Sequence, residues 1–303
     1  QNFLTKRINN LTVHFNSEDR FVLDHGSSIQ HEVVVSIARK KSCKTLSLPH
    51  GLMLHSGLKN KAHDSLIFSR SNPLNFYDQV IFPNEISESF GDPNHDVKRI
   101  LGSARFSKDW IKELKKIYSV TGKKDKEKIN IVVLAEKMGI TQGKEYIPFI
   151  DAESMKQIVA SLSNQKDLNI VIKHHPNILE VENESNPYFL KSATHKVGMK
   201  TTSSFELIYK ADLVITTASS VILDAINLYR PIIFLDHVSS FDLIFKHYFD
   251  SQCTKNIKDF ENLLDKAING EFKVNLDQYD RFYLDIVESR GAPLKNYSKF
   301  ITQ

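Results

Sequence analysis

Short apolar runs alternate with amphipathic stretches through the second half of the chain. The runs are of strand length and rich in Ile, Val and Leu, and the stretches between them place apolar residues at helical spacing. The predicted strands are Ile129–Leu134, Leu168–Ile172, Asp212–Thr216 and Pro231–Leu235, and the predicted helices are Glu153–Ser163, Phe205–Lys210, Ser220–Leu228 and Asn256–Ile268. Strands this apolar, separated by helices, are typical of a sheet buried on both faces. The pattern therefore predicts a doubly wound α/β domain.

The first part of the chain alternates in the same way, with shorter helices between its later strands. Its predicted strands are Phe21–Leu23, Thr45–Leu48, Ser65–Phe68, Gln79–Phe82 and Arg99–Leu101, and its predicted helices are Val33–Arg39 and Ser107–Tyr118. The apolar residues on one face of the second helix are Trp110, Leu114, Ile117 and Tyr118. Strands that end in loops and recur in this order indicate a second parallel sheet.

A break in composition separates the two parts. No large apolar residue lies between Val120 and Ile129, and the segment Ser119–Asn130 contains four lysines, as is typical of a solvated linker. We therefore expect a Rossmann-like N-terminal domain over residues 1–118, a linker over 119–128 and a Rossmann-like C-terminal domain over 129–270. The tail, Leu276–Ile301, has a helical pattern, and helices over residues 271–303 are expected to pack across the domain boundary.

Composition limits the class of protein. The 303 residues, 41% hydrophobic and 25% charged, are enough for about two domains with cores of their own. No apolar run approaches the ~18 residues of a membrane-spanning helix. No signal peptide is visible, and the absence of an initiator Met favours a processed or trimmed fragment. Cys43 and Cys253 are too few for a disulfide framework or a zinc cluster and fit a reducing compartment.

Charge gives little support for a polyanion partner. The formal net charge of +4 is small, and the lysines gather in the linker without interleaved aromatic residues. A nucleic acid partner is therefore not expected. The sequence has no metal-ligand spacing, no Gly-rich phosphate loop and no Gly-x-Ser-x-Gly elbow, so no metal site is expected either.

Ligands of open parallel sheets bind beyond the carboxyl ends of the strands, so candidate residues are sought there. Lys173 and His175 follow the strand Leu168–Ile172, on the same side by alternation, and Pro176 forces the chain to turn. An ammonium and an imidazole in this place suit an oxyanion such as a phosphate. The alternative is a surface loop with incidental basic residues.

The next candidates lie between the third strand and the helix that follows it. The hydroxyls of Ser219 and Ser220, with free backbone amides at a helix N-terminus, would seat a phosphate. Ordinary helix capping is the alternative, although it needs only one such residue. Asp224, on the same face four residues after Ser220, would accept hydrogen bonds from ribose hydroxyls or would compensate the helix dipole.

Two further candidates belong to the first part of the chain. His50 follows a strand and would take a proton from an acceptor hydroxyl, or would be a structural histidine bonded to loop backbone. His25 is a weaker rival in a similar place. Arg105 follows the strand Arg99–Leu101 and would bind phosphate from the other side of a cleft, or would pair with Asp109.

The stretch from Lys173 to Asp236 resembles the nucleotide-binding half of GT-B glycosyltransferases. The matching elements are the His175-Pro176 loop and the sequence FELIYKADLVITTASSVILDAINLYRPIIFLD at Phe205–Asp236. They are most similar to the branch that contains teichoic-acid glycerophosphotransferases, capsule Kdo transferases and other bacterial surface-polysaccharide transferases. Some bacterial sialyltransferases share the paired His-Pro and Ser-Ser motifs and use them to hold CMP. The resemblance also touches Leu48–Gly51 and the sequence LGSARFSKDW at Leu101–Trp110.

This resemblance implies a GT-B fold, with an acceptor-binding N-terminal domain and a donor-binding C-terminal domain facing a cleft. It implies that His175, Ser219 and Ser220 hold the donor phosphate, that Lys173 adds charge, that Asp224 meets the ribose, and that His50 is the base. Pro49 stands where the teichoic branch usually has an aromatic residue, so the role of His50 is left open. The first segment is also short for a complete Rossmann domain, so an opening strand or two is expected to be missing or reduced.

The implied activity is metal-independent transfer of a sugar or polyol phosphate from a CMP-, CDP- or UDP-linked donor to a bacterial surface glycan or lipid-linked glycan. No cofactor is needed, because the nucleotide sugar is the substrate. The implied location is the cytoplasm, with peripheral contact at the inner membrane as a further expectation. The alternatives are a UDP-sugar 2-epimerase, for which no matching cluster of acids and histidines is visible, and a non-catalytic glycan- or nucleotide-binding module of a larger polymerase.

Overall fold

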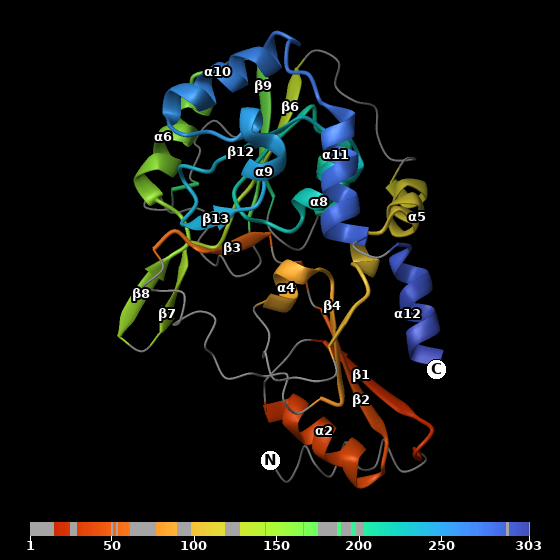
Figure 1. Ribbon diagram of the computed structural model, residues 1–303. Helices are drawn as coiled ribbons and strands as arrows, with labels where there is room; N and C mark the ends of the chain where they lie inside the picture. The colour runs from red at the N-terminus through yellow and green to blue at the C-terminus, as the bar shows by residue number, and fades with distance from the viewer. Residues whose placement is uncertain are drawn as a thin grey trace. The chain divides into compact units, whose positions relative to one another are not determined.

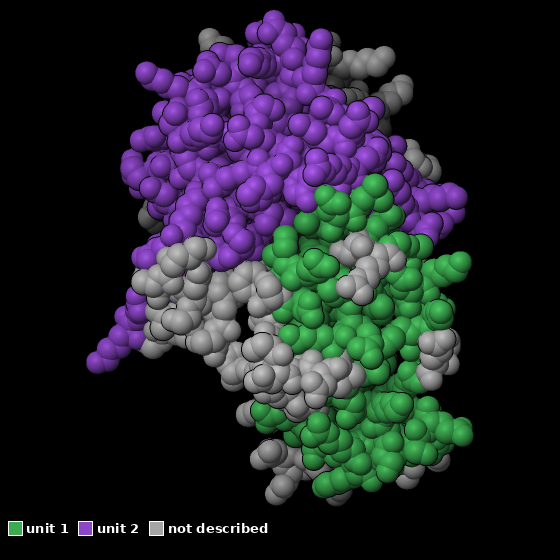
Figure 2. Space-filling model, in the orientation of Figure 1, with its two compact units in different colours: residues 1–53, 65–107, 284–303 green, residues 54–64, 108–283 purple. Residues whose placement is uncertain are grey.

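The chain forms two compact units, drawn in separate colours in Figure 2. Unit 1 comprises residues 1–53, 65–107 and 284–303, and unit 2 comprises residues 54–64 and 108–283. The computed structural model describes residues 15–24, 29–49, 51–52, 54–60, 77–89, 98–118, 128–142, 144–165, 167–174, 187–188, 195–197, 203–288 and 291–302. Within these ranges, no helix combines the length and the apolar character needed to cross a membrane.

A five-stranded parallel sheet forms the centre of unit 2. Its strands are β6 (Ile129–Leu134), β9 (Leu168–Lys173), β10 (His195–Val197), β11 (Leu213–Thr216) and β12 (Ile232–Phe234). Their order is β10-β9-β6-β11-β12, and every pairing is parallel. The chain thus starts in the middle, runs outward to one edge and returns to build the other side, as in doubly wound folds. The predicted α/β domain is confirmed.

Helices cover this sheet on both faces (Figure 1). On one face α6 (Ala152–Ser163) and α10 (Ile257–Ile268) contact each other and share a buried cluster with alternate strand residues. On the other face Phe234 stacks on Phe245 and on Phe249 of α9 (Lys246–Phe249), and Phe249 contacts Phe282 of α11 (Leu276–Tyr283). Apolar side chains alternate between these two layers, which is why the strands read as continuous apolar runs.

The remaining elements of unit 2 are short or lie outside the main sheet. They are α5 (Lys108–Tyr118), α7 (Ser204–Lys210), α8 (Ile222–Asn227), η3 (Asp250–Gln252), the antiparallel pair β7 (Gly139–Gln142) and β8 (Glu145–Pro148), and the antiparallel pair β3 (His55–Leu58) and β13 (Phe241–Leu243). The pattern analysis does not predict these two pairs, because each strand is too short to show a period.

Unit 1 contains a four-stranded parallel sheet in the order β1-β2-β4-β5. Its elements are β1 (Arg20–Asp24), α2 (Ile29–Lys40), β2 (Lys44–Leu48), β4 (Gln79–Phe82), α4 (Glu85–Ser89), β5 (Lys98–Ile100), η2 (Ala104–Phe106), the π-helix η4 (Leu284–Glu288) and α12 (Pro293–Thr302). Four buried side chains, Val35, Tyr77, Val80 and Phe82, form its core cluster. The predicted strand Ser65–Phe68 lies outside the described residues.

The two units depart from the predicted domain ranges at three places. Residues 54–64 belong to unit 2, where β3 pairs with β13. Residues 108–118 also belong to unit 2, because α5 contacts α7 and α8. The tail divides after Tyr283, so that α11 belongs to unit 2 and α12 to unit 1. Each departure rests on contacts between distant parts of the sequence, which a local pattern does not contain.

Helix α5 is present as predicted, but its buried face is not the one that the pattern suggests. Ile111 is the buried residue of the helix, whereas Trp110 and Ile117 are 43% and 63% exposed. Tyr118 contacts Phe205 of α7, with ring centroids 5.5 Å apart. The position of α7 and α8, rather than the width of the apolar stripe, decides which side chains of α5 are covered.

Candidate functional site

Four strands of the unit 2 sheet end side by side, and the residues that end them form one row. Lys173 of β9 is in register with Leu134 of β6, Leu134 with Thr216 of β11, and Thr216 with Phe234 of β12. We call this end of the sheet, with the residues that directly follow the four strands, the carboxyl edge. Residues in register on parallel strands point to the same face. Lys173 and Thr216 therefore share a face, about 10 Å apart at the usual strand spacing.

Lys173 is held at this edge as a partly desolvated cation. Its side chain is 9% exposed, and burial lowers the pKa of its ammonium. The next residue, His174, points to the opposite face, where its ring meets the buried ring of Tyr188 edge-on at 6.3 Å. His174 is therefore part of the core. His175 and Pro176, the other candidates of this loop, lie outside the described residues.

The turn between β11 and α8 places two serines at the same edge. Helix α8 starts at Ile222 rather than at Ser220, and its N-cap residue, Val221, makes no side-chain cap. The carbonyl oxygens of Ser219 and Ser220 accept from the first helical amides, whereas within the described part of the chain their hydroxyls make no hydrogen bond. Ordinary capping therefore does not account for these hydroxyls. A helix of six residues adds little dipole, so the hydroxyls rather than the helix end are the groups to consider.

Asp224 lies inside α8, with its side chain completely buried. It is the third residue of α8 and so belongs to the first helical turn. Its contact with ribose and its compensation of the helix dipole both stay predictions. Arg105 belongs to unit 1, where it is exposed in η2 and its guanidinium lies 4.3 Å from the centre of the Phe106 ring. His50 and its rival His25 lie outside the described residues, so their roles stay predictions as well.

Glu136, which the sequence analysis does not single out, is a further ionisable group at the carboxyl edge. It follows β6, its Oε2 atom is fully covered, and burial raises the pKa of its carboxyl although the backbone N–H of Lys137 donates to Oε1 at 3.3 Å. Its backbone N–H donates to the hydroxyl of the buried Tyr188 at 2.9 Å. The sequence contained a signal for this residue, because Glu136 is the second residue after the predicted strand Ile129–Leu134.

We expect Glu136→Gln to change the pH dependence of stability. Because the folded-state pKa is raised, the wild type loses stability as pH rises from about 4.5 through that pKa, whereas the amide does not ionise. The variant should match the wild type near pH 4 and exceed its free energy of unfolding by about 1 kcal/mol at pH 8. Urea unfolding at several pH values measures this difference. Glu271→Gln, at an exposed carboxyl, is the control, and a pH-independent difference for Glu136→Gln would contradict the assignment.

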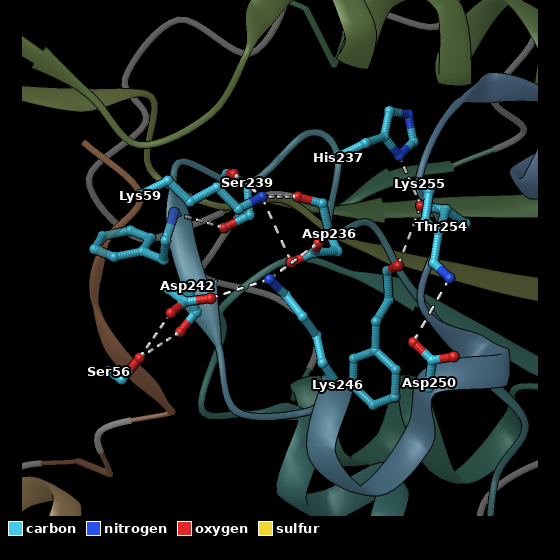
Figure 3. Close-up of polar contacts among 12 residues, drawn as sticks. Ser56, Lys59, Asp236, His237, Ser239, Asp242, Lys246, Asp250, Thr254 and Lys255 are labelled. Atoms are coloured by element: carbon cyan, nitrogen blue, oxygen red, sulfur yellow. Dashed lines mark hydrogen bonds and ion pairs between the residues drawn. The ribbon is translucent and has the colours of Figure 1, made fainter. Parts of the chain in front are cut away.

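An ion-pair network closes the carboxyl edge on the β12 side (Figure 3). Asp236, two residues after β12, lies between the ammonium groups of Lys59 and Lys246, each 3.5 Å from one of its carboxylate oxygens. Lys246 also donates to Asp242 at 3.0 Å, and Lys59 to the carbonyl oxygen of Ser239 at 2.9 Å. The network ties residues 54–60 to the end of the sheet. It was not predicted, because it depends on the pairing of β3 with β13.

His237 lies next to this network, and burial lowers the pKa of its imidazole, an effect that a hydrogen bond with the backbone of Thr254 opposes only in part. Its Nδ1 atom also lies 2.7 Å from the Thr254 hydroxyl. Among the described residues, no three His, Cys, Asp or Glu side chains come together in a way that could hold a metal ion. The chemical groups that the described carboxyl edge offers a ligand are thus an ammonium, several hydroxyls and a buried carboxyl.

Comparison with known proteins gives the fold. No known protein family and no curated protein matches the chain. Solved structures do match, among them the UDP-GlcNAc 2-epimerase from Neisseria meningitidis bound to UDP-GlcNAc, which is 13% identical, with 98% of this chain and 79% of that chain covered and a TM-score of 0.55.

Two further matches are similar in extent. The UDP-GlcNAc 2-epimerase from Methanocaldococcus jannaschii is 16% identical, with 92% of this chain and 79% of that chain covered and a TM-score of 0.52. An E. coli structure named for trehalose-6-phosphate, bound with UDP-2-fluoro glucose, is 10% identical, with 100% and 77% covered and a TM-score of 0.55. These likenesses show that the chain has the GT-B fold, with a Rossmann-like parallel sheet in each unit, as predicted.

Proposed function

We propose that this chain is a nucleotide-sugar-dependent transferase that moves a sugar, or a sugar-like polyol phosphate, from a CMP-, CDP- or UDP-linked donor to a bacterial surface glycan or lipid-linked glycan. The observation that carries the proposal is the arrangement of Lys173, Ser219 and Ser220 at the carboxyl edge of one parallel sheet, where ligands of open α/β sheets bind. Two of the similar structures hold ligands of this chemical class, UDP-GlcNAc and UDP-2-fluoro glucose.

In the proposed reaction, the bond between the transferred group and the donor phosphate breaks, and negative charge builds on the departing nucleotide. The Lys173 ammonium and the hydroxyls of Ser219 and Ser220 would donate hydrogen bonds to that charge. Groups fixed in advance where charge develops stabilise the transition state more than the ground state. The chain's own donors supply this stabilisation, so the scheme needs no metal or cofactor.

The remaining candidates take the roles that the resemblance implies. His175, with Pro176 shaping its loop, would contact the same phosphate as Lys173. Asp224 would orient the ribose. His50 would accept the proton of the acceptor hydroxyl as that oxygen attacks, and Arg105 would bind phosphate from the acceptor domain.

Calorimetric titration with CMP, CDP, UMP and UDP tests the donor site. We expect at least one nucleotide to bind the wild type with a Kd below about 1 mM. His175→Ala and the double variant Ser219→Ala/Ser220→Ala should each weaken it by about tenfold or more, because a hydrogen bond to a charged group contributes about 1.5–3 kcal/mol. The control is Ser161→Ala/Ser163→Ala on α6, which also removes two serine hydroxyls from unit 2 but away from the carboxyl edge, and it should leave the Kd unchanged. If no nucleotide binds in this range, the donor-site proposal fails.

A UDP-sugar 2-epimerase is the second candidate, because two of the similar structures carry that name. An epimerase converts its free donor, whereas a transferase needs an acceptor. Incubation with UDP-GlcNAc alone, followed by product analysis, separates the two, since only an epimerase would yield the 2-epimer. A non-catalytic module would bind the nucleotide and give no product with or without acceptor.

A further inference from the structure

A cavity in unit 2 lies away from the carboxyl edge. Its volume is about 540 Å³, within the usual range of ligand pockets, and α5, the C-terminal end of α8 and α11 enclose it. Helix α8 leaves the carboxyl edge at Ile222, and it is the last residues of this helix, Ile226 and Asn227, that line the cavity. We call this cavity the basic pocket. Its lining residues are Lys108, Ile111, Lys112, Lys115, Lys116, Ile226, Asn227, Tyr229, Tyr279, Asp280 and Tyr283.

The floor of the basic pocket is apolar and fixed. Its side chains Ile111, Ile226, Tyr279 and Tyr283 are packed, each at most 3% exposed. Tyr229, 40% exposed and stacked on Tyr279 with ring centroids 6.3 Å apart, is the aromatic surface of this floor that a ligand can reach. The Tyr279 hydroxyl is held from behind, where it donates to the carbonyl oxygen of Arg230 at 2.8 Å. An apolar group placed against Tyr229 would exclude water from its exposed ring.

The rim of the basic pocket is cationic. Four lysines on successive turns of α5 line it, and two of them are engaged, Lys108 with Asp280 at 3.7 Å and Lys116 with Glu113 at 2.6 Å. Lys112 and Lys115 form no ion pair with any residue of the described ranges. Two ammonium groups are thus available to an anionic ligand on the same helix face that borders the apolar floor.

One wall of the pocket is built with unusual backbone geometry. Tyr229 has φ +51°, in the left-handed region that a bulky side chain rarely adopts. Its hydroxyl donates to Asp280 at 2.7 Å, and Asp280 in turn pairs with Lys108. The carboxylate of Asp280 is thus paired within the pocket, which reduces its repulsion of an anion bound to Lys112 and Lys115.

We propose that the basic pocket binds a phosphorylated amphiphile, with its phosphate on Lys112 and Lys115 and its apolar part against the exposed ring of Tyr229. A phosphate monoester carries a charge of about −1.5 to −2 at pH 7, which matches two ammonium groups better than a carboxylate does. Lysine is a common phosphate ligand. This ligand class is independent of the donor at the carboxyl edge.

Dodecyl phosphate below its micelle-forming concentration is the probe for the full chain. Calorimetry gives its Kd, and fluorescence of Trp110, the single tryptophan and a residue of α5, reports binding beside the pocket. We expect saturable one-to-one binding and a Kd raised at least tenfold in Lys112→Gln/Lys115→Gln. Lys258→Gln/Lys266→Gln, which removes the same charge from exposed positions of α10, should change it less than twofold. An equal loss in both double variants would overturn the proposal.

Three further probes identify the ligand. Inorganic pyrophosphate that binds as tightly as dodecyl phosphate would show that the floor is unused, and dodecanoate that binds as tightly would show that phosphate is not selected; either result overturns the proposal. Vesicles of phosphatidylcholine with phosphatidic acid, a lipid whose headgroup is a phosphate monoester, test a lipid source. If the wild type binds both dodecyl phosphate and the vesicles, and Lys112→Gln/Lys115→Gln binds the vesicles more weakly, the ligand is a lipid headgroup. If the wild type binds dodecyl phosphate but not the vesicles, the ligand is soluble. Ser219→Ala/Ser220→Ala should leave all of these unchanged, so this site and the donor site can fail separately.

Discussion

Replacing Lys173 by methionine should raise the Kd of the nucleotide that binds the wild type by about 10- to 100-fold. The ammonium is largely buried at the carboxyl edge, where a charge-assisted hydrogen bond to phosphate is worth about 1.5–3 kcal/mol. Methionine keeps an unbranched side chain one atom shorter than that of lysine and removes the charge. Calorimetric titration near pH 7 measures the loss, and Lys258→Met, an exposed lysine of α10, is the matched control.

The pH dependence of binding adds a second test of Lys173. Because burial lowers the pKa of its ammonium, the wild type should lose its advantage over Lys173→Met at a lower pH than the ordinary lysine value of 10.5. Burial also disfavours the charged form in the folded state, so the methionine variant should unfold at an equal or higher urea concentration at pH 7. Unchanged nucleotide affinity in a folded variant would remove Lys173 from the donor site.

Gly102→Ala should destabilise unit 1 by about 3 kcal/mol or more. Gly102 has φ +82°, and a Cβ at this position would lie 2.8 Å from the Glu288 carbonyl oxygen and 2.9 Å from that of Val287. Backbone atoms cannot move aside cheaply, because Ser103 donates to Val287 and the Tyr297 hydroxyl to Gly102 itself. Overpacking and left-handed strain therefore add. Urea unfolding followed by circular dichroism, with hydrogen exchange over residues 98–106, measures the effect.

Gly270→Ala provides the comparison for this change. Gly270 has φ +72°, but a Cβ there would meet no atom within 4 Å, so only the backbone strain of about 1 kcal/mol is expected. Equal losses in the two variants would mean that the close approach of Val287, Glu288 and Pro293 to Gly102 does not affect stability. A larger loss for Gly102→Ala would explain the glycine in the LGSARFSKDW sequence by packing against the C-terminal segment.

The carboxyl edge shows how far a strand pattern reaches. The strand Ile129–Leu134 is confirmed at its predicted bounds, and the ends of the predicted strands Leu168–Ile172 and Asp212–Thr216 lie within one residue of the observed ones. Since parallel strands end at one edge, the placement of Lys173 and of the turn with Ser219 at the same edge, with β6 between their strands, followed from the sequence. The start of α8 did not follow, because Ser220 looks like a cap and only the path of the backbone places the first helical residue at Ile222.

The succession of short apolar runs and amphipathic stretches was sufficient for the α/β class and the main strands of both units. A strand buried on both faces is a continuous apolar run, and an amphipathic helix repeats its apolar residues every three or four positions, so both can be recognised from a few consecutive residues. Only the tertiary structure showed which residues belong to unit 2, which side of α5 is buried, and that an ion-pair network surrounds Asp236. These features depend on pairings such as Ser56 with Asp242, 186 residues apart, whose formation is governed by the packing of whole elements rather than by their local residue order. The basic pocket belongs to the same group, because α5, α8 and α11 each contribute only part of its lining.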